Sequence, residues 1–575
     1  MIQKILRLIP NSRKILLGLI LLGSMVSTVQ ILTARTMGQL TGIAAAEELS
    51  GLVKPALYTG ALFLLQAVLN AIFLSCRGIF SANSNRILQK HFTKILTEVQ
   101  IAWMDRYPKG DLHSRFQECS DISEFIGQTL PDIAFQTLRI FLFIFYMALL
   151  DLYLTCAYLI CTIIVVAIQS TIVSPLQKRL TVVKDAQGSL SSLAQDILTQ
   201  RRTIKIYGAQ ESLYGKFKKR SHSVCKAEIR SSTVSLPLKV FGWLSGIFPI
   251  LLLCSMGLSR VATGAVTLSA LISMYYLAQN IMTDLLHYTE MFSDLSRGNA
   301  SIERYLTIIS GPREAEEWLT QSNHDEVGSE TENDALIQFS EIEFSYKNEN
   351  SDQKVSPVLQ DISFSVFPGQ IVMLVGTNGS GKSTILRLAA GLEVPNRGGI
   401  FMRGRSYSSM SLDEIRSQLA LVRQDSFLFS VSLKENFRLI DSNGDIEAAL
   451  RDAQVTLDLS VYAGEGGGAL SGGERQRISL ARGLYSDVPI LLLDEATASL
   501  DAKTECRIMS VIKNRNDYSA VLMTAHRLSV VQYADVVIFL DQGMVIASGT
   551  HSNLLDSCDQ YSRFWENTEE EVYIS

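Results

Sequence analysis

The sequence predicts a two-domain protein, in which an all-α domain of six transmembrane helices is followed by an α/β domain of the P-loop type. Three observations support this prediction. The length of 575 residues exceeds what one compact domain normally holds. Apolar stretches long enough to cross a bilayer occur only before about residue 335, and a glycine-rich loop followed by a helical pattern occurs after it. The predicted domains are therefore 1–310 and 335–575, joined by a linker at 311–334.

The composition excludes several classes of protein. Hydrophobic residues make up 47% and charged residues 19%, and the mean hydropathy is +0.19. These values argue against a disordered or fibrous chain and indicate that part of the chain lies in lipid. The net charge of −5 and the pI near 5.9 give no basis for a nucleic-acid partner, because phosphate-backbone binding needs a strongly cationic surface.

The eight cysteines form no CxxC pair and no spacing typical of zinc ligands, so no metal site and no disulfide is predicted for them. Several stand in or beside apolar runs, as expected of small apolar side chains in reduced surroundings.

Six apolar stretches are long enough, or nearly so, for the roughly 20 helical residues that cross a bilayer. They cover 15–32, 55–76, 133–150, 152–173, 240–257 and 266–282. The first follows basic residues, as a signal peptide would, but no clear cleavage motif comes after it and five further stretches do.

Basic residues predict the orientation of these spans, because cytoplasmic loops retain lysine and arginine. The loops 77–131 and 174–238 are long and rich in both, whereas the opposite loops carry only Arg35, Lys54 and Arg260. Both chain ends and both long loops are therefore expected in the cytoplasm. Helical patterns at 87–100 and 194–207 predict that helices extend well beyond the membrane.

The stretch 311–334 contains many acidic residues and a single arginine, Arg313. This composition is most simply that of a solvated linker. A regulatory role for the acidic run is a less favoured alternative.

A P-loop is the strongest motif in the second half. The apolar run 371–375 predicts a strand and 385–392 predicts a helix, and the loop between them can close backbone N–H groups around phosphate oxygens. Lys382 is expected to reach the β- and γ-phosphates of ATP, and Ser383 to ligate Mg²⁺. The predicted nucleotide-binding residues of this loop are Gly376, Thr377, Asn378, Gly379, Ser380, Gly381, Lys382, Ser383 and Thr384.

Two adjacent carboxylates, Asp494 and Glu495, end an apolar run that begins at Pro489. Ligands of open α/β sheets bind at the carboxyl ends of strands. Asp494 suits the control of Mg²⁺, and Glu495 can polarise an attacking water as a general base. Adjacent carboxylates at a strand end are weak evidence alone, so this assignment depends on the P-loop.

Between these motifs lies Leu-Ser-Gly-Gly-Glu-Arg-Gln-Arg at 470–477, and with it the sequence resembles the ATP-binding cassette (ABC) transporter family. The family's signature motif normally has Gln where this chain has Glu474. Ser471, Gly472 and Gly473 precede the predicted helix 474–482, so that hydroxyl and N–H donors point at an anion. The resemblance implies that this anion is the γ-phosphate of ATP bound to a partner's P-loop.

Four further positions match the family one by one. Tyr346, in the alternating run 342–346, resembles the aromatic residue that stacks on adenine. Gln424 resembles the glutamine that touches Mg²⁺ and water and reports to the membrane domain. Asp501, with Ser499 and Leu500, resembles the loop that crosses the dimer interface, and His526 resembles the switch histidine that holds the γ-phosphate.

One departure from the family concerns its helical subdomain. Only about 40 residues separate Val431 from the signature motif, roughly a dozen fewer than the resemblance leads us to expect. The segment 464–466 resembles the loop that contacts the coupling helices of a partner's membrane domain. The shortening bears on coupling geometry rather than on hydrolysis.

The membrane half resembles exporter-type half-transporters, in its six spans and in the segments 103–115 and 300–304. This implies a dimer with a second half-transporter, either identical or different. We expect the coupling helices of the two long loops near 121–125 and 199–203. The resemblance favours a multi-pass protein of a bacterial inner (plasma) membrane, with the nucleotide-binding domain in the cytoplasm.

Polar residues in the spans are candidates for a cargo cavity, because charges are expensive in hydrocarbon. Tyr276, Asn280 and Asp284 share one helical face, and Arg139 stands in the third span near Gln136. The alternative is that Arg139 snorkels to the interface and that Asp284 lies beyond the lipid. Further polar residues on a neighbouring face of the sixth span are Gln279, Thr283 and His287.

The predicted function is ATP-driven export of a small amphipathic or peptide-like molecule. An importer with the same architecture, as some siderophore systems have, and a nucleotide-gated regulatory membrane subunit are the alternatives. The predicted cofactors are ATP and Mg²⁺, and the predicted partners are the lipid bilayer, a second half-transporter and the cargo.

Overall fold

A computed structural model of the chain describes residues 1–45, 52–104, 106–107, 109–314, 334–346, 357–440, 444–498, 500–514, 520–525 and 527–574. By contact the chain divides into two compact units. One comprises Met1–Ile95 and Lys109–Ser310, and the other comprises Leu96–Pro108 and Gly311–Ser575. The predicted linker lies mostly outside the described residues.

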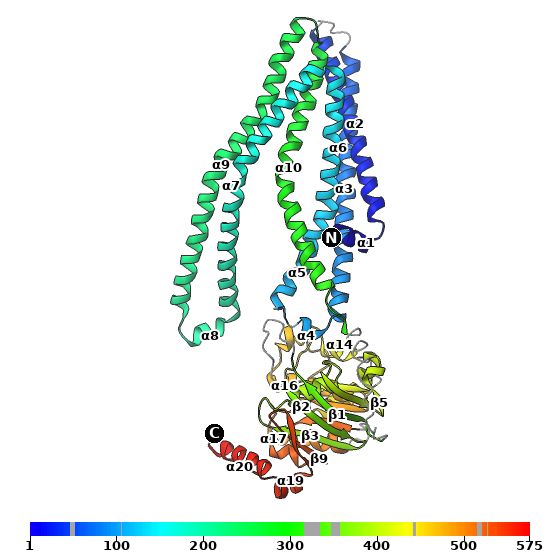
Figure 1. Cartoon of the computed structure of the whole chain (residues 1–575), viewed down its shortest axis with the longest axis vertical. Helices are drawn as coiled ribbons and strands as arrows, with labels where there is room; N and C mark the ends of the chain where they lie inside the picture. The colour runs from blue at the N-terminus through cyan, green and yellow to red at the C-terminus, as the bar shows by residue number, and fades with distance from the viewer. Residues whose placement is uncertain are drawn as a thin grey trace. The chain divides into compact units, whose positions relative to one another are not determined.

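The first unit is entirely helical (Figure 1). Its long helices α7 and α9 pack along one another and are joined by the short α8. The helices are α1 Ile2–Leu8, α2 Ser12–Ala45, α3 Val53–Glu98, α5 Lys109–Glu124, α6 Leu130–Leu150, α7 Leu152–Thr199, α8 Arg201–Ile206, α9 Gln210–Ala262 and α10 Leu268–Ile309, with a π-helical turn, η2, at Phe125–Thr129 between α5 and α6.

Each of the six predicted spans falls on one of these helices, namely α2, α3, α6, α7, α9 and α10. Within the described residues, three helical segments are long and apolar enough to cross a membrane: Ser12–Ala45, Val53–Glu98 and Gly110–Leu150. Two shorter apolar segments, Leu152–Ile168 and Gly246–Ala262, lie on α7 and α9. The sixth predicted span occupies the first part of α10.

Small residues bring α2 and α10 close together. A Cβ added to Gly38 would lie 2.2 Å from the carbonyl oxygen of Ser269, and the hydroxyl of Ser273 donates to the carbonyl of Ala34 at 3.0 Å. Close approach through small residues and interhelical hydrogen bonds are the usual means by which helices pack in lipid.

The charged residues of the spans are paired with one another. The Arg139 guanidinium on α6 binds both carboxylate oxygens of Asp284 on α10, and its Nε donates to Oδ2 at 2.8 Å. Asp284 is almost fully buried. Arg77 on α3 pairs with Asp132 on α6. The pairing explains how Arg139 and Asp284 are tolerated in an apolar bundle, and their role in a cargo cavity stays a prediction.

The second unit contains two sheets. The larger has the order β10-β9-β3-β8-β7-β6 and is parallel except for the edge strand β10, and the smaller, antiparallel sheet has the order β2-β1-β4-β5. The strands are β1 Ile337–Phe344, β2 Leu359–Val366, β3 Gln370–Gly376, β4 Arg397–Met402, β5 Arg405–Ser406, β6 Leu419–Val422, β7 Ile490–Leu493, β8 Ala520–Thr524, β9 Val536–Asp541 and β10 Met544–Gly549.

The second unit also contains short helices, most of which connect strands, while α4 precedes the first strand and α19 and α20 follow the last (Figure 1). They are α4 Ile101–Met104, α12 Lys382–Ala389, α13 Leu412–Arg416, α14 Leu433–Arg438, α15 Ile446–Asp452, α16 Gly472–Tyr485, α17 Ala502–Asn514, α18 Leu528–Val531, α19 His551–Ser557 and α20 Asp559–Ile574, with 3₁₀ turns η3 at Tyr407–Ser409 and η4 at Glu465–Gly467.

The central strands β3, β7, β8 and β9 of the larger sheet are buried on both faces, as their continuous apolar sequences require, whereas the edge strand β10 is partly exposed. Alternate residues of β3 enter two different cores because side chains point to opposite faces of a strand. Met373 and Val375 belong to one hydrophobic cluster, whereas Val372 and Leu374 belong to the other. The carboxyl end of β3 is thereby held firmly, and the P-loop begins there.

The long loops are helical as predicted, because α3 continues to Glu98 and α7 to Thr199. Two details differ from the prediction. The helical run 194–207 is broken at Gln200, which separates α7 from α8. The segment 121–125, expected near a coupling helix, lies instead inside the continuous run of α5 and η2. The short helix in that loop is α4, and it belongs to the second unit. Helical periodicity in a sequence does not show at which residue a long helix is interrupted.

Candidate functional site

The P-loop leaves the end of β3 and begins α12 as predicted. Gly376 packs so closely that an added Cβ would lie 2.0 Å from the carbonyl oxygen of Leu540. Gly379 and Gly381 have φ angles of +83° and +100°, which a residue with a Cβ adopts only under strain. These glycines therefore make a tight loop that other residues would not form. Asn378 is exposed on the same loop.

The P-loop contains buried polar groups that can bind an anion. The Lys382 ammonium is buried and donates to the carbonyls of Gly376 at 2.8 Å and Thr377 at 2.9 Å. Burial lowers the pKa of Lys382, and Glu495 and Asp494 oppose that shift. The hydroxyl of Ser380 is buried and has no hydrogen-bond partner in the described part of the chain. A phosphate would supply the acceptor that the Ser380 hydroxyl lacks and an acceptor for the third N–H of the Lys382 ammonium.

Ser383 and Asp494 meet at the start of α12. The Ser383 hydroxyl donates to Oδ1 of Asp494 at 2.8 Å, although 111 residues separate them in sequence. The Thr524 hydroxyl, at the end of β8, also donates to Asp494 at 3.4 Å and accepts the backbone N–H of Glu495 at 2.8 Å. Thr524 thus fixes both neighbouring carboxylate residues, a contact that the sequence did not reveal.

Gln424 lies against Glu495. Its Nε2 donates to the Glu495 carboxylate at 2.5 Å. The strands β6 and β7 are parallel neighbours, so the segments that follow them meet at the same sheet edge. Glu495 has a φ of +48°, a sparsely populated conformation for a residue with a side chain.

The signature segment forms the N-terminus of α16, two residues before the predicted start at 474. Ser471 is the N-cap, and its hydroxyl accepts the backbone N–H of Glu474 at 3.3 Å. In return the Glu474 carboxylate accepts the Ser471 N–H at 2.9 Å and hydroxyl at 2.7 Å. These bonds lower the pKa of Glu474. The carboxylate is therefore charged at neutral pH, beside donors predicted to face a phosphate.

Three other predicted residues lie around this group. Tyr346 stands two residues beyond the end of β1, and its hydroxyl is 3.2 Å from the Thr384 hydroxyl, so the predicted strand is too long at that end. Asp501 precedes α17 and accepts the Thr504 N–H at 3.0 Å. His526 and Ser499 lie outside the described residues.

The structure therefore joins the P-loop, Asp494, Glu495 and Gln424 into one group of contacting side chains. The signature residues Ser471 to Glu474 cap a separate helix, which reaches this group through Gln476, whose Nε2 donates to the Glu495 carbonyl at 3.0 Å. The contacts of Thr524 and Gln476 were missed because no local pattern marks a side chain that binds a distant backbone.

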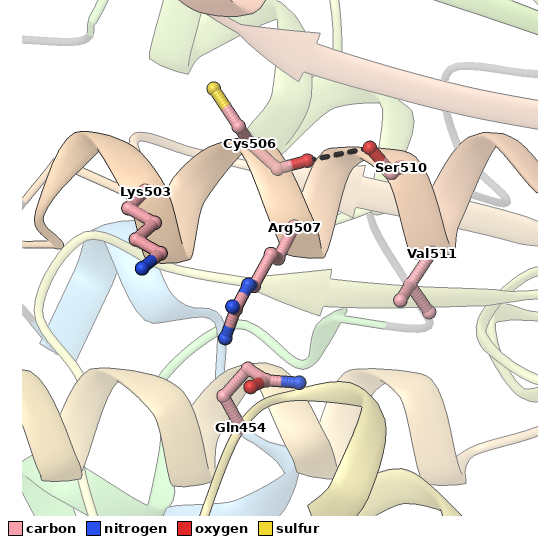
Figure 2. A pocket seen from close by; sticks show the side chains of 6 residues that line it. All are labelled: Gln454, Lys503, Cys506, Arg507, Ser510 and Val511. Atoms are coloured by element: carbon pink, nitrogen blue, oxygen red, sulfur yellow. Dashed lines mark hydrogen bonds between the residues drawn. The ribbon is translucent and has the colours of Figure 1, made fainter.

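A shallow pocket of about 490 Å³ lies between the end of α15 and α17 (Figure 2). It is lined by Gln454, Lys503, Cys506, Arg507, Ser510 and Val511, none of which is among the predicted site residues. The residues predicted to bind phosphate and metal lie elsewhere, at the carboxyl ends of β3, β6 and β7.

Two family models match this chain. The model described as ABC transporter transmembrane region matches residues 14–285, and the model described as ABC transporter matches residues 359–498. The second match includes the P-loop, Gln424, the signature segment, Asp494 and Glu495.

Two curated relatives are similar to this chain. The ATP-dependent lipid A-core flippase of Xanthomonas euvesicatoria pv. vesicatoria (strain 85-10) is 29% identical over 396 residues, which cover 66% of this chain and 64% of the relative. The match thus spans less than two thirds of the flippase. The multidrug resistance ABC transporter ATP-binding and permease protein of Lactococcus lactis subsp. cremoris (strain MG1363) is 26% identical and covers 88% of this chain and 85% of the relative.

A solved structure shares the fold. The structure of a bacterial Atm1-family ABC exporter with ATP bound superposes with a TM-score of 0.77 at 22% identity, covering 97% of this chain and 99% of that one. The predicted fold class, a helical transmembrane domain followed by a P-loop α/β domain, is confirmed. Because a transmembrane-region model and a nucleotide-binding model match consecutive parts of one chain, this protein belongs to the ABC transporter family.

Proposed function

We propose that this chain hydrolyses ATP to export a small amphipathic or peptide-like molecule from the cytoplasm, acting as one half of a dimer. The observation that carries the proposal is the meeting of Ser383, Asp494, Glu495 and Gln424 beside the P-loop. These four side chains, from three segments of the chain, and the P-loop together supply what phosphoryl transfer to water requires: phosphate binding, metal ligation and a base for the water.

The residues present fit Mg-ATP. The donors of Lys382, the unpartnered Ser380 hydroxyl and the glycine backbone suit a triphosphate. Ser383, Asp494 and Gln424 supply the oxygen ligands that Mg²⁺ prefers. Tyr346 is 37% exposed beside the loop, where an adenine ring could stack. When bound, the metal would neutralise charge that develops on the phosphates.

The other proposed roles concern the attacking water and the partner cassette. Glu495 accepts a proton from the attacking water, and Gln424 orients that water and the metal. Ser471, Gly472 and Gly473 bind the γ-phosphate held by a partner's P-loop. Asp501 belongs to the loop that crosses between the two cassettes.

We propose that His526 holds the γ-phosphate, as its position in the family implies. The partner is a second half-transporter, identical or different. We propose that the protein lies in a bacterial inner membrane, with its cassette in the cytoplasm. Its bacterial relatives and the basic residues of its long loops support this proposal.

The test is phosphate release from Mg-ATP by the chain alone, purified and reconstituted in lipid, beside Glu495→Gln. The variant is expected to retain ATP binding and to lose turnover by about 10²-fold or more, the lower range for loss of a general base. Binding is read separately by the thermal shift that ATP produces. Turnover near that of the wild type in the variant would contradict the role of Glu495.

Direction is tested in inverted vesicles, whose cassettes face the outside medium. ATP-dependent accumulation of a fluorescent amphipathic probe inside these vesicles is expected for an exporter. Accumulation only in right-side-out vesicles loaded with ATP would indicate an importer. The Glu495→Gln variant is the matched control in both preparations.

A further inference from the structure

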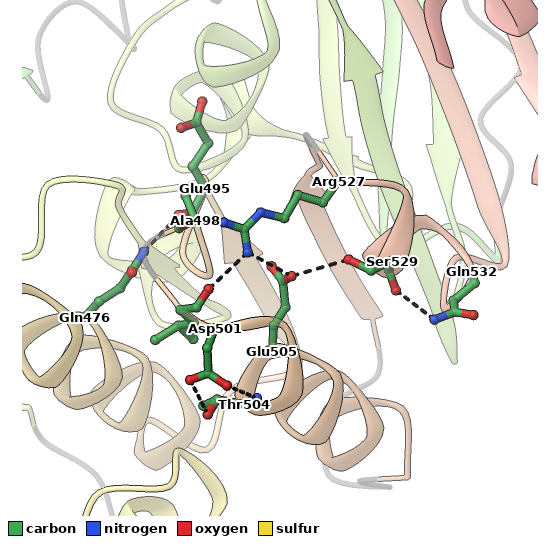
Figure 3. A network of polar contacts seen from close by, with 10 residues as sticks. Gln476, Glu495, Ala498, Asp501, Thr504, Glu505, Arg527, Ser529 and Gln532 are labelled. Atoms are coloured by element: carbon green, nitrogen blue, oxygen red, sulfur yellow. Dashed lines mark hydrogen bonds and ion pairs between the residues drawn. The ribbon is translucent and has the colours of Figure 1, made fainter. Parts of the chain in front are cut away.

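The described residues between Glu495 and Asp501, which are 496–498 and 500, belong to no helix or strand, yet side chains from elsewhere in the chain bind their backbone (Figure 3). Three carbonyl oxygens in this region accept hydrogen bonds from two side chains. Gln476, on α16, binds the carbonyl of Glu495 at 3.0 Å. Arg527 binds the carbonyls of Ala498 at 3.1 Å and Leu500 at 3.0 Å.

Arg527 makes these contacts in a fixed geometry. Its Nη2 binds Ala498, and its Nη1 binds both Leu500 and the Glu505 carboxylate, the latter at 3.3 Å. A planar guanidinium can bind several acceptors at once, whereas a lysine ammonium at the same place is a single point charge. The side chain thus joins the segment before α18 to the carbonyls of Ala498 and Leu500 and to α17.

Glu505 is the counter-charge of Arg527. Its side chain is only 2% exposed, whereas that of Arg527 is 45% exposed. The Ser529 hydroxyl lies 3.5 Å from the same carboxylate oxygen, and the Glu505 backbone N–H donates to the Asp501 carbonyl at 2.9 Å. A buried carboxylate at this place holds the guanidinium against the loop.

We propose that Arg527 is a positioning residue for ATP hydrolysis, which fixes the carbonyls of Ala498 and Leu500 and thereby the directions of Glu495 and Asp501, with Glu505 as its buried counter-charge. The inference rests on the proposed function. Glu495 begins the turn that Arg527 closes, because the Ala498 N–H donates to the Glu495 carbonyl at 3.1 Å. Small displacements of a group that acts on the attacking water reduce turnover strongly.

The test separates positioning from charge balance. Arg527→Met removes the carbonyl contacts and leaves the buried Glu505 unpaired, so both stability and turnover are expected to fall. Arg527→Met with Glu505→Gln removes the unpaired charge but does not restore the carbonyl contacts. In the double variant the melting temperature is expected to recover, while kcat stays about tenfold to a hundredfold low and KM for ATP changes much less.

Recovery of kcat together with the melting temperature in the double variant would overturn the proposal, because Arg527 would then only balance a charge. Arg527→Lys keeps the charge and carries the test if Arg527→Met does not fold. Its kcat is expected to be low at an unchanged melting temperature, and wild-type kcat would overturn the proposal. Lys513→Met, at the other end of α17, is the matched control and is expected to leave kcat unchanged.

A second readout does not depend on turnover. Hydrogen–deuterium exchange of peptides that cover 495–504 is expected to be at least several-fold faster in the double variant than in the wild type. Exchange at wild-type rates would overturn the proposal. Faster exchange in the variant, together with no phosphate release by the wild type, would contradict the proposed function and leave the positioning contact supported.

Discussion

The amide of Gln424 donates to the carboxylate of Glu495 at 2.5 Å, and so joins the loop after β6 to the residue that follows β7 and Asp494. The two residues are 71 positions apart in sequence. They meet because β6 and β7 are parallel neighbours whose carboxyl ends share one edge. Because the Gln424 amide is neutral, it can orient the Glu495 carboxylate without neutralising its charge.

Replacing Gln424 by Ala is expected to lower kcat for ATP hydrolysis by about tenfold to a hundredfold, because both Glu495 and the water lose an orienting partner. ATP affinity should change little, since the P-loop is intact. The measurement is steady-state phosphate release with a separate nucleotide-binding titration. Gln418→Ala, just before β6, is the matched control, and an equal loss in both variants would argue against the contact.

Glu474 occupies the place of the usual signature glutamine, and its carboxylate accepts the Ser471 hydroxyl. Because its pKa is lowered, it carries a negative charge beside donors proposed to face phosphate. Glu474→Gln keeps the capping geometry and removes this charge. We expect KM for ATP to fall about threefold, since hydrogen bonds to a charged acceptor compete more strongly for the hydroxyl.

The control for Glu474 lies in the same unit. Glu435 forms an identical capping box with Ser432 at the start of α14. Glu435→Gln therefore changes the same kind of helix cap without altering the signature segment, and it should leave KM unchanged. If both variants lower KM equally, the effect comes from the cap and not from the charge at Ser471.

Local patterns predicted the fold and selected the candidate site residues because their signals are contained in short segments. The glycine loop at Gly376 follows a strand pattern, the apolar run before Asp494 ends in two carboxylates, and Ser471 stands before a helical pattern. The contacts of Thr524, Gln476 and Arg527 could not be predicted in this way. Their partners are backbone groups whose positions depend on strand order.

Element ends were less predictable than elements. The alternating pattern up to Tyr346 continues beyond β1 because alternation reports which side chains are buried, not which backbone groups pair. The break at Gln200 was not predicted for a related reason. An exposed continuous helix and an exposed helix with one interruption can have the same residue composition.

Lys382 gives a pH dependence with a definite sign. Burial puts its pKa below the ordinary value of 10.5, so in the folded chain it loses its proton at a lower pH than an unfolded lysine does. Between these two pKa values the unfolded chain binds more protons, and stability without nucleotide rises with pH. ATP affinity instead falls as the pH rises, because deprotonated Lys382 no longer offers the phosphates a positive charge.

We therefore expect ATP affinity to fall by about tenfold per pH unit once the pH exceeds the Lys382 pKa. Lys382→Arg should bind more weakly at neutral pH but show no alkaline loss, since guanidinium does not titrate there. The measurement is a fluorescent-nucleotide titration between about pH 7 and 10, in EDTA so that magnesium hydroxide does not form. The same alkaline loss in both proteins would exclude Lys382 as its source.

Asp284 and Arg139 provide a test of the membrane unit. Asp284→Asn leaves the Arg139 charge unpaired in a bundle where the aspartate side chain is only 2% exposed. Breaking a buried pair in this way costs about 3–5 kcal/mol, whereas replacing both partners by apolar residues is often neutral. The single variant should therefore melt well below the wild type, and Arg139→Met with Asp284→Leu should recover most of the loss.

Thermal unfolding in lipid, followed by tryptophan fluorescence, measures this difference. The exposed pair Arg297 and Asp294 on the same helix provides the control, and Asp294→Asn should change little. If the double variant regains stability but does not transport, the ion pair also takes part in cargo transport. Charge balance in the bundle is intact in that variant and therefore cannot explain the loss. Recovery of both would assign the pair to helix packing, and polar cargo contacts would have to come from other residues of α10, such as Gln279 and Thr283.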